Sequence, residues 1–268
     1  MQVTGTVISQ RQLAEDTYCL RISVPEIAGQ FVPGQFLMIR PLHGTDPILG
    51  RPFALYDVIR DASGSPVAVE FAYHVVGKLT ELMSQWSGGE EICVWGPLGN
   101  GFPAASASHL MCVGGGIGYT PFPAVIRQSL AAGLTDRVTF CYAAQKKAKL
   151  ADLEGLEHVS GVNVQLATDD GSQGHHGLVT DLVREALNGP QDDRPGQVFC
   201  CGPEPMMKAV AELCEAAKVT CWLSLETPMA CGFGACFSCV TKVKTDDGWD
   251  YRRTCVEGPI FPAECLEL

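Results

Sequence analysis

The sequence predicts three segments in succession: an antiparallel β-barrel, a doubly wound α/β domain with a parallel sheet, and a small cysteine-rich β domain. Residues 1–103 alternate apolar and polar residues with a period of two, which is typical of half-buried strands. Residues 104–218 instead alternate strand-like and helix-like runs, and residues 219–268 are short and rich in cysteine. We therefore expect three domains with these boundaries.

Composition and charge argue against several classes of protein. The chain has 268 residues, of which 46% are hydrophobic and 18% are charged, as in globular proteins. The net charge of −11, without a basic stripe, argues against nucleic acid and anionic membranes as partners. The apolar runs are short and broken by glycine, and the N-terminus alternates like a strand rather than a signal peptide. We expect a cytoplasmic protein without membrane contact.

The first segment contains five period-two runs that we predict to be strands, with glycine and proline at the turns between them. The stretch Lys78–Gln85 is predicted to be a helix. About six short strands with one helix favour a small antiparallel barrel. The five runs are residues 2–13, 17–24, 33–42, 67–76 and 90–99.

The second segment is predicted to form a parallel sheet covered by helices, because strand-like and helix-like runs alternate. The predicted strands are residues 109–115, 137–144, 162–170 and 197–203. The predicted helices are residues 120–133, 180–187 and 203–218.

Two glycine-containing turns follow strands of this predicted sheet. VGGGIGYTP, residues 113–121, departs from the dinucleotide fingerprint because Pro121 replaces its third glycine, and CGP, residues 201–203, ends a later strand. Glycine lets the backbone approach a pyrophosphate, and both turns lie at carboxyl ends of parallel strands. The pair predicts a dinucleotide cleft, with a plain tight turn as the alternative. Its candidate residues are Gly114, Gly115, Gly116, Gly118, Cys201, Gly202 and Pro203.

The chain contains 13 cysteines, a high number. The cytosol keeps thiols reduced, so a disulfide framework is not expected. Several cysteines lie inside apolar runs and are interpreted as small buried core residues. These are Cys19, Cys93, Cys112, Cys141 and Cys200.

Three further cysteines are crowded into MACGFGACFSCV, residues 229–240. The spacing Cys231-x4-Cys236-x2-Cys239, with a distant fourth cysteine, is that of a plant-type [2Fe–2S] cluster, whereas zinc sites usually combine two C-x2-C pairs. Both Cys255 and Cys265 are candidates for the fourth ligand. We favour Cys255, because a hairpin with its turn at residues 247–248 would return the chain beside Cys239.

The order of these motifs resembles the ferredoxin–NADP reductase-like family, in which a flavin barrel precedes a nicotinamide domain. RPFALYD, residues 51–57, resembles the family's first flavin signature, and AYHVVGKLTELM, residues 72–83, resembles its second. The resemblance implies that Arg51 pairs with the flavin pyrophosphate and that Phe53 and Tyr56 form walls of the flavin site. The FAD-binding residues that it implies are Arg51, Pro52, Phe53, Ala54, Ala72, Tyr73, His74, Leu79 and Thr80.

Three of these residues depart from the family pattern. Ala54 stands where serine is usual, His74 where arginine is common, and Leu79 where glycine is usual. Contacts with the flavin and its phosphates are therefore expected to be rearranged. For His74, a half-buried strand residue is the alternative to a ligand.

A third segment, ATDDGSQGHHGLVTD at residues 167–181, also matches the family. The resemblance implies that Asp169 and Asp170 lie near an adenosine ribose, where carboxylates accept from hydroxyls and repel a 2′-phosphate. This favours NAD over NADP, although the pair also suits a simple turn. Cys201 is implied to lie near the nicotinamide, with a buried strand-end thiol as the alternative.

The C-terminal sequence indicates which branch of the family the chain resembles. LSLETPMACGFGACFSCVTKV, followed by RRTCVEGPIF, resembles the iron–sulfur electron-transfer subunits of NAD-dependent dihydroorotate dehydrogenase, and the likeness covers essentially the whole chain. It implies an oxidoreductase subunit of de novo pyrimidine biosynthesis, with one FAD and one [2Fe–2S] cluster per chain and NAD(H) as substrate. It also implies a partner that contains FMN and oxidises dihydroorotate, in a heterotetramer with two copies of each chain.

Other functions are compatible with the same motifs. Related FAD and [2Fe–2S] subunits serve ferredoxin, sulfide or hydrogen as redox partners. A self-sufficient reductase is a further alternative, although its ferredoxin-like domain is usually longer than the last segment here. A zinc-stabilised nucleotide-binding module is the non-enzymatic alternative.

Overall fold

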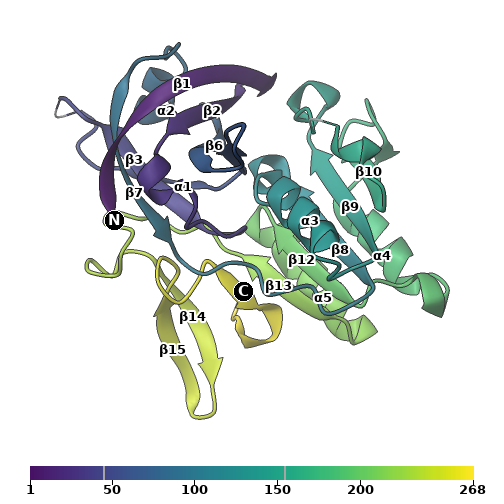
Figure 1. The fold of residues 1–268 in the computed structure, drawn as a ribbon. Helices are drawn as coiled ribbons and strands as arrows, with labels where there is room; N and C mark the ends of the chain where they lie inside the picture. The colour runs from purple at the N-terminus through teal and green to yellow at the C-terminus, as the bar shows by residue number, and fades with distance from the viewer. Residues whose placement is uncertain (45, 154) are drawn as a thin grey trace.

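The computed structural model describes residues 1–44, 46–153 and 155–268. It contains two seven-stranded sheets and a two-stranded hairpin that projects away from them (Figure 1). The N-terminal sheet, in purple and blue, lies beside the second sheet, in teal and green, and the yellow hairpin lies below the N-terminal sheet in this view (Figure 1). The predicted class is confirmed: a curled antiparallel sheet, a parallel α/β domain and a cysteine-rich β segment.

The N-terminal sheet has the order β4-β3-β7-β1-β2-β6-β5, and all neighbouring strands are antiparallel. Its concave face encloses apolar side chains such as Leu20, Leu37 and Phe71. The five predicted runs all form strands, and the structure adds β4 and β5 from the first flavin signature. The elements are β1 (Gln2–Ala14), β2 (Thr17–Ser23), α1 (Pro25–Ala28), β3 (Phe36–Pro41), β4 (Arg51–Ala54), β5 (Asp57–Arg60), β6 (Pro66–His74), α2 (Lys78–Met83) and β7 (Glu91–Leu98).

The second sheet has the order β11-β10-β9-β8-β12-β13-β16, with every pair parallel except β13 and β16. Helices pack on its two faces, as predicted. Its elements are β8 (His109–Gly115), α3 (Phe122–Ala131), β9 (Arg137–Ala144), β10 (Val162–Thr168), β11 (His175–His176), α4 (Val179–Asn188), β12 (Gln197–Cys201), α5 (Glu204–Ala217), β13 (Thr220–Ser224) and β16 (Ile260–Pro262). Short 3-10 turns are η1 (Gly116–Tyr119), η2 (Lys147–Lys149), η3 (Leu156–His158), η4 (Gln191–Asp193) and η5 (Ala263–Cys265).

The last segment is attached to the second sheet at both of its ends. β13 pairs with β12, and β16 pairs with β13, so residues 220–224 and 260–262 extend the sheet of the preceding segment. The cysteine loop and the hairpin of β14 (Val240–Thr245) and β15 (Gly248–Arg253) lie between these strands in the chain. The division into 1–103, 104–218 and 219–268 stays a prediction, since two strands of the last range share the second domain's sheet.

The hairpin is present, but its turn differs from the prediction. Thr245 pairs with Gly248, which leaves Asp246 and Asp247 as the two-residue loop instead of residues 247–248. Gly248 then opens β15 with a φ of +128°, a conformation that glycine adopts without a side-chain clash.

The first two domains share an apolar core. Tyr56 and Ala72 from the N-terminal sheet belong to the same buried cluster as Tyr119 and Phe122 from the second domain. The five cysteines that were interpreted as core residues are all buried. In the described part of the chain, no helix combines the length and the apolar character needed to cross a membrane.

Candidate cofactor and iron–sulfur sites

The four predicted cluster ligands lie in one loop region as two pairs of thiols. The Sγ atoms of Cys239 and Cys255 are 3.2 Å apart, and both residues are buried. The exposed thiol of Cys236 interacts with Cys231. Among the described residues, no three metal-ligating side chains converge on a single point. Two pairs suit the four cysteines of a two-iron cluster better than the single tetrahedron of a zinc site.

The thiols of Cys236 and Cys255, one from each pair, differ in pKa. The Ser238 Oγ lies 3.2 Å from the Cys236 Sγ. Hydrogen bonds from Ser238 and from Cys231 lower the pKa of Cys236 to about 6. Burial and the neighbouring Cys239 raise the pKa of Cys255 to about 12. Because metal ligation needs thiolates, a cation bound by the buried pair would displace the proton of Cys255.

The backbone around the thiols is held by glycines and by a buried threonine. Gly232 and Gly234 have φ values of +77° and +89°, and a Cβ on Gly232 would stand 2.6 Å from the Met38 Cγ. The backbone N–H and the hydroxyl of Thr254 both donate to the carbonyl of Cys239, at 2.8 and 2.9 Å. These contacts fix the turn after β15, which carries Cys255, beside Cys239, as the predicted hairpin required. Cys265 instead donates to the carbonyl of Pro262 at 3.0 Å.

The buried thiol pair packs against the N-terminal sheet. Cys239 and Cys255 form a cluster with Phe36 and Met38 of β3. β3 pairs directly with β4, and Met38 lies opposite Pro52 of the first flavin signature. One strand therefore separates the signature from the buried thiols.

The first flavin signature forms the edge strand β4. Arg51 is exposed, and its Nη1 donates to the carbonyls of Leu49 and Gly50 at 3.1 and 3.0 Å. Leu49, whose carbonyl accepts from Arg51, is a large apolar residue that is 50% exposed. A forked cation next to uncovered apolar surface fits a pyrophosphate-bearing cofactor.

The aromatic residues of this signature are placed differently from the expectation. Tyr56 is fully buried between the domains, with its ring 6.0 Å from that of Tyr119, so it is not free to line a cofactor site. Phe53 packs into the barrel core, 4.8 Å from the ring of Phe71 and 6.1 Å from that of Tyr73. The sequence pattern could not reveal this, because the burial of both rings depends on non-local packing.

The second flavin segment forms the end of β6 and the start of α2. Ala72 and Tyr73 are buried, and the Tyr73 hydroxyl donates to the Gln10 Oε1 at 2.6 Å. Leu79 is buried in the barrel core. The Thr80 hydroxyl donates to the Gly77 carbonyl and accepts from the N–H groups of residues 76 and 77. The N–H groups of residues 76 and 77 are therefore already paired, and a phosphate at this turn would have to bind N–H groups further along the first turn of α2.

A cavity of about 590 Å³ opens at the carboxyl ends of the second sheet. Of the predicted residues, Gly115, Gly116, Asp169 and Pro203 line it, and so does His74 from the N-terminal sheet. The ring Nδ1 of His74 lies 2.7 Å from the Thr17 Oγ1, and burial followed by the charge of Lys149 lowers the pKa of His74. The volume and the glycine-lined wall fit a dinucleotide.

The remaining predicted glycines lie behind the cavity wall, where they allow backbone segments to pack closely. A Cβ on Gly118 would stand 2.4 Å from the carbonyl oxygen of Cys201, and one on Gly202 would stand 3.1 Å from the Cα of Gly115. The two glycine-containing turns therefore touch backbone to backbone. Gly114 packs in the same way, with its Cβ position 3.0 Å from the Cα of Tyr119.

The two carboxylates and the thiol of the predicted nicotinamide site have different environments. Asp169 faces the cavity, whereas the carboxylate of Asp170 accepts from the N–H and the hydroxyl of Ser172 at 2.9 and 2.5 Å, which closes a turn. The thiol of Cys201 is enclosed, and burial raises its pKa to about 12 despite a hydrogen bond with Ser224.

Several cavity residues were not predicted. Lys149 follows β9, and the starts of α4 and α5 contribute the rest of the wall. The residues at the starts of α4 and α5 could have been predicted from the sequence, since helices that follow parallel strands begin at the ligand-binding edge of the sheet. The additional lining residues are Ala143, Ala144, Gln145, Lys149, Leu178, Val179, Thr180, Pro205, Met206 and Ala209.

Comparison with known families agrees with this geometry. Residues 226–267 match the iron–sulfur cluster binding domain of dihydroorotate dehydrogenase B, and residues 112–212 match the oxidoreductase NAD-binding domain. The first range contains all four cysteines of the two thiol pairs, and the second contains the glycine loop and most of the cavity wall. The fold and the sites define a NAD-linked iron–sulfur oxidoreductase of the ferredoxin–NADP reductase-like type.

Proteins that are similar to this chain over nearly its whole length identify the family within this class. The electron transfer subunit of dihydroorotate dehydrogenase B (NAD(+)) from Geobacillus thermodenitrificans is 37% identical over 261 residues, covering 96% of this chain and 95% of the relative. The corresponding subunit of Fusobacterium nucleatum is 34% identical over 268 residues, covering 98% and 97%. The chain belongs to the family of dihydroorotate dehydrogenase B electron transfer subunits, and the predicted family and electron-transfer role are confirmed.

Solved structures show the same architecture. The structure of an NADH-dependent reduced ferredoxin–NADP oxidoreductase, described in the context of flavin-based electron bifurcation, superposes with a TM-score of 0.83 at 27% identity, covering 98% of this chain and 89% of that one. A ferredoxin–NADP+ reductase from Neisseria gonorrhoeae superposes with a TM-score of 0.67 at 16% identity over 81% of this chain and 91% of that one. The second likeness shows the fold alone.

Proposed function

We propose that this chain carries electrons between a dihydroorotate-oxidising partner subunit and NAD, through a [2Fe–2S] cluster and an FAD. The observation that supports this proposal most strongly is that the thiols lie between the protein surface and the N-terminal sheet. Cys236 is exposed, whereas Cys239 and Cys255 are buried against β3, the strand next to the flavin signature. A cluster held there would lie between an external partner and the flavin segment.

The division of labour follows from the chemistry of the groups. When bound, FAD exchanges single electrons with an iron–sulfur cluster and electron pairs, as hydride, with a nicotinamide. The residues of this chain bind and position these groups: Arg51 offers a forked donor to the FAD pyrophosphate, and Gly115 and Gly116 offer their backbone to the dinucleotide. Phe36 and Met38 shield the buried thiols from water.

The proposed FAD site also includes the other residues that the resemblance implied, which are Pro52, Phe53, Ala54, Ala72, Tyr73, His74, Leu79 and Thr80. The proposed NAD site includes the residues behind the cavity wall. The carboxylate of Asp169 at the cavity favours NAD, because it would accept from a ribose hydroxyl and repel a 2′-phosphate. The proposed cluster ligands are Cys231, Cys236, Cys239 and Cys255, since Cys255 lies beside Cys239 whereas Cys265 hydrogen-bonds elsewhere.

The proposed partner is an FMN-containing dihydroorotate dehydrogenase subunit, in a cytoplasmic heterotetramer with two copies of each chain. It would dock where Cys236 reaches the surface. Phe233 and Phe237 flank this cysteine in the loop and are 61% and 63% exposed, which suits a protein interface. Shielding by a partner would also protect the exposed ligand.

Co-purification from the native host, combined with assays of the isolated chain, tests the proposal. The isolated chain should contain FAD, iron and labile sulfide and should oxidise NADH with an artificial acceptor. Dihydroorotate turnover should appear only when the FMN-containing subunit is present. Zinc without iron, or dihydroorotate turnover by the chain alone, would contradict the proposal. A ferredoxin as the sole co-purifying partner would instead support a ferredoxin-linked function.

A further inference from the structure

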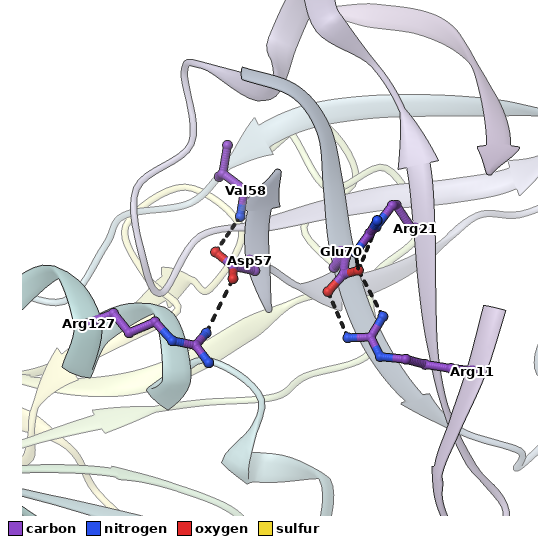
Figure 2. Close-up of polar contacts among 6 residues, drawn as sticks. All are labelled: Arg11, Arg21, Asp57, Val58, Glu70 and Arg127. Carbon is purple, nitrogen blue, oxygen red and sulfur yellow. Dashed lines mark hydrogen bonds and ion pairs between the residues drawn. The ribbon is translucent and has the colours of Figure 1, made fainter. Parts of the chain in front are cut away.

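An ion pair joins the N-terminal sheet to the second domain. The Asp57 Oδ2 lies 3.2 Å from the Nη1 of Arg127, and the Oδ1 of the same carboxylate accepts from the Val58 N–H at 2.8 Å (Figure 2). Asp57 opens β5, at the edge of the first sheet, and Arg127 lies on α3. The carboxylate is thus held on one side by its own strand and on the other by a helix of the neighbouring domain.

Both partners lie close in sequence to a proposed cofactor site. Asp57 follows the flavin segment Arg51–Ala54 by three residues, and α3 begins directly after the glycine turn. Between them, Tyr56 packs against Tyr119, the last residue of η1. The end of the flavin signature therefore makes two contacts with the second domain: an aromatic contact of Tyr56 with the dinucleotide turn and an ion pair of Asp57 with α3.

The backbone of Glu70 holds the segment of Asp57 in place. Glu70 on β6 is the cross-strand partner of Asp57, and its backbone carbonyl accepts from the Tyr56 N–H at 2.8 Å. Its side chain, 3% exposed, receives a two-pronged pair from Arg11 at 2.8 and 2.9 Å and a further bond from the Arg21 Nε at 2.7 Å (Figure 2).

The arginine partners of Glu70 and Asp57 come from different domains. Burial alone would raise the pKa of Glu70, but the bonds and charges of Arg11 and Arg21 lower it, so this carboxylate stays ionised within its own sheet. Burial raises the pKa of Asp57, and Arg127 is among the groups that oppose this rise. Glu70 is thus satisfied by the first domain, whereas Asp57 takes its direct guanidinium partner from the second domain.

The domains are also joined at a second point. The turn between β1 and β2 meets the loop after β9, where the Glu15 N–H donates to the Ala148 carbonyl at 2.8 Å. Lys146 and Glu15 form an ion pair of 2.6 Å across the same contact. Together with the apolar core that the two domains share, this contact and the pair of Asp57 with Arg127 restrict rotation of one domain against the other.

We propose that Asp57 and Arg127 are a positioning pair that sets the orientation of the flavin segment relative to the dinucleotide turn. This inference rests on the proposed function, because it concerns the hydride step between those two sites. Neither residue touches the reacting atoms: Arg127 acts through Asp57 and the adjoining segment. Loss of alignment by about 1 Å can lower the rate of a chemical step by roughly a hundredfold without a matching loss of binding.

The test compares Arg127→Ala, Arg127→Lys and Asp57→Asn with Arg137→Ala in the full-length, cofactor-loaded protein. Arg137 is the matched control, since its 2.9 Å pair with Asp193 lies within the second domain. We expect Arg127→Ala and Asp57→Asn to lower kcat for NADH oxidation about tenfold, with KM within about twofold of wild type. Arg127→Lys should recover at least half of kcat, and Arg137→Ala should match wild type.

Two further measurements separate positioning from general loss of structure. The long-wavelength absorbance of the complex between flavin and nicotinamide should weaken in Arg127→Ala and return in Arg127→Lys. Without dinucleotide, amide hydrogen exchange should accelerate in β5 and α3 of Arg127→Ala but not in β9 or β10. Unchanged kcat and unchanged exchange, a rise in KM at constant kcat, or an equal effect of Arg137→Ala would overturn the inference.

The same experiment distinguishes this inference from the proposed function. If the wild-type protein fails to oxidise NADH, the proposed function is wrong, and the exchange data still decide whether the pair holds the domains together. If the wild type is active and the variants behave like it in kcat, absorbance and exchange, the positioning role alone is wrong.

Discussion

The indole Nε1 of Trp95 donates a hydrogen bond to the carbonyl oxygen of Cys231 at 2.8 Å, across 136 positions of sequence. Trp95 lies on β7 and pairs with Met38 of β3, the residue that packs against the buried thiols. On its other side, the indole contacts Gly50, where any Cβ would overlap the ring. One side chain thus ties the cysteine loop to the sheet immediately beside the flavin signature.

Replacing Trp95 by phenylalanine removes this hydrogen bond and keeps an aromatic ring. We expect Trp95→Phe to lower the free energy of unfolding by about 1 kcal/mol, the usual contribution of such a bond, and to lose iron faster in the presence of a chelator. Trp249→Phe on the exposed hairpin is the control. Equal rates of iron loss in the two variants would show that the bond does not hold the loop.

The two candidates for the fourth cluster ligand give a direct comparison. Cys255→Ser should bring iron and labile sulfide close to zero, because it removes half of the buried thiol pair, while FAD stays bound. Cys265→Ser should keep the iron and sulfide content of wild type, because that thiol donates to the Pro262 carbonyl. Metal and sulfide analysis with visible spectra measures both, and full cluster content in Cys255→Ser would refute the ligand set.

Gly118 has no room for a side chain against the CGP turn. In Gly118→Ala, the Cβ would stand 2.4 Å from the Cys201 carbonyl oxygen, so the two turns must separate. We expect KM for NADH to rise at least about tenfold, equivalent to about 1.4 kcal/mol of binding free energy. Gly133→Ala, with a φ of +64° but no atom within 4 Å of its Cβ, is the control for backbone strain. A comparable KM in the two variants would count against the contact between the turns.

Glu70 links stability to pH. Its pKa is lower in the folded chain than the ordinary value of 4.5, so its ionised form stabilises the fold above that pH, and this contribution disappears as the pH falls through the lowered folded pKa. Glu70→Gln should cost about 2 kcal/mol at pH 7, because two arginines lose a buried partner, and the difference from wild type should shrink below about pH 4. Urea unfolding at several pH values measures this.

The control for Glu70 is Asp193→Asn, which removes an exposed pair with Arg137 and should change stability by less than about 1 kcal/mol. A Glu70→Gln variant as stable as wild type at pH 7, or one whose deficit grows in acid, would contradict the assignment of Glu70 as an ionised anchor.

The local sequence pattern was sufficient to predict most helices and strands and to find the cysteine and glycine motifs. The strand predicted at residues 137–144 is β9 residue for residue, and the helix predicted from Lys78 is α2. The spacing of the cysteines also indicated that Cys255 would meet Cys239, because a hairpin returns the chain over a short distance. These features are encoded within about thirty residues of sequence, where periodicity and turn chemistry dominate.

With the exception of the hairpin turn, the features that the sequence did not reveal are non-local contacts. The pairing of β16 with β13 joins segments that are far apart in the chain, and nothing in the sequence Ile260–Pro262 specifies its partner strand. The burial of Tyr56 and the bond from Trp95 to Cys231 both depend on how two sheets and a loop are oriented in space. The hairpin turn shifted by one residue because Thr245, rather than Asp246, forms the last pair with β15.

The most direct test of the account is an anaerobic titration of the purified, cofactor-loaded chain with NADH, followed by electron paramagnetic resonance. We predict that NADH both bleaches the flavin and produces the signal of a reduced [2Fe–2S] cluster in the wild type. In Gly118→Ala, both changes should require far more NADH. A flavin that is bleached by NADH while the cluster stays oxidised, although dithionite reduces it, would contradict the proposed link between the nicotinamide cavity and the four cysteines.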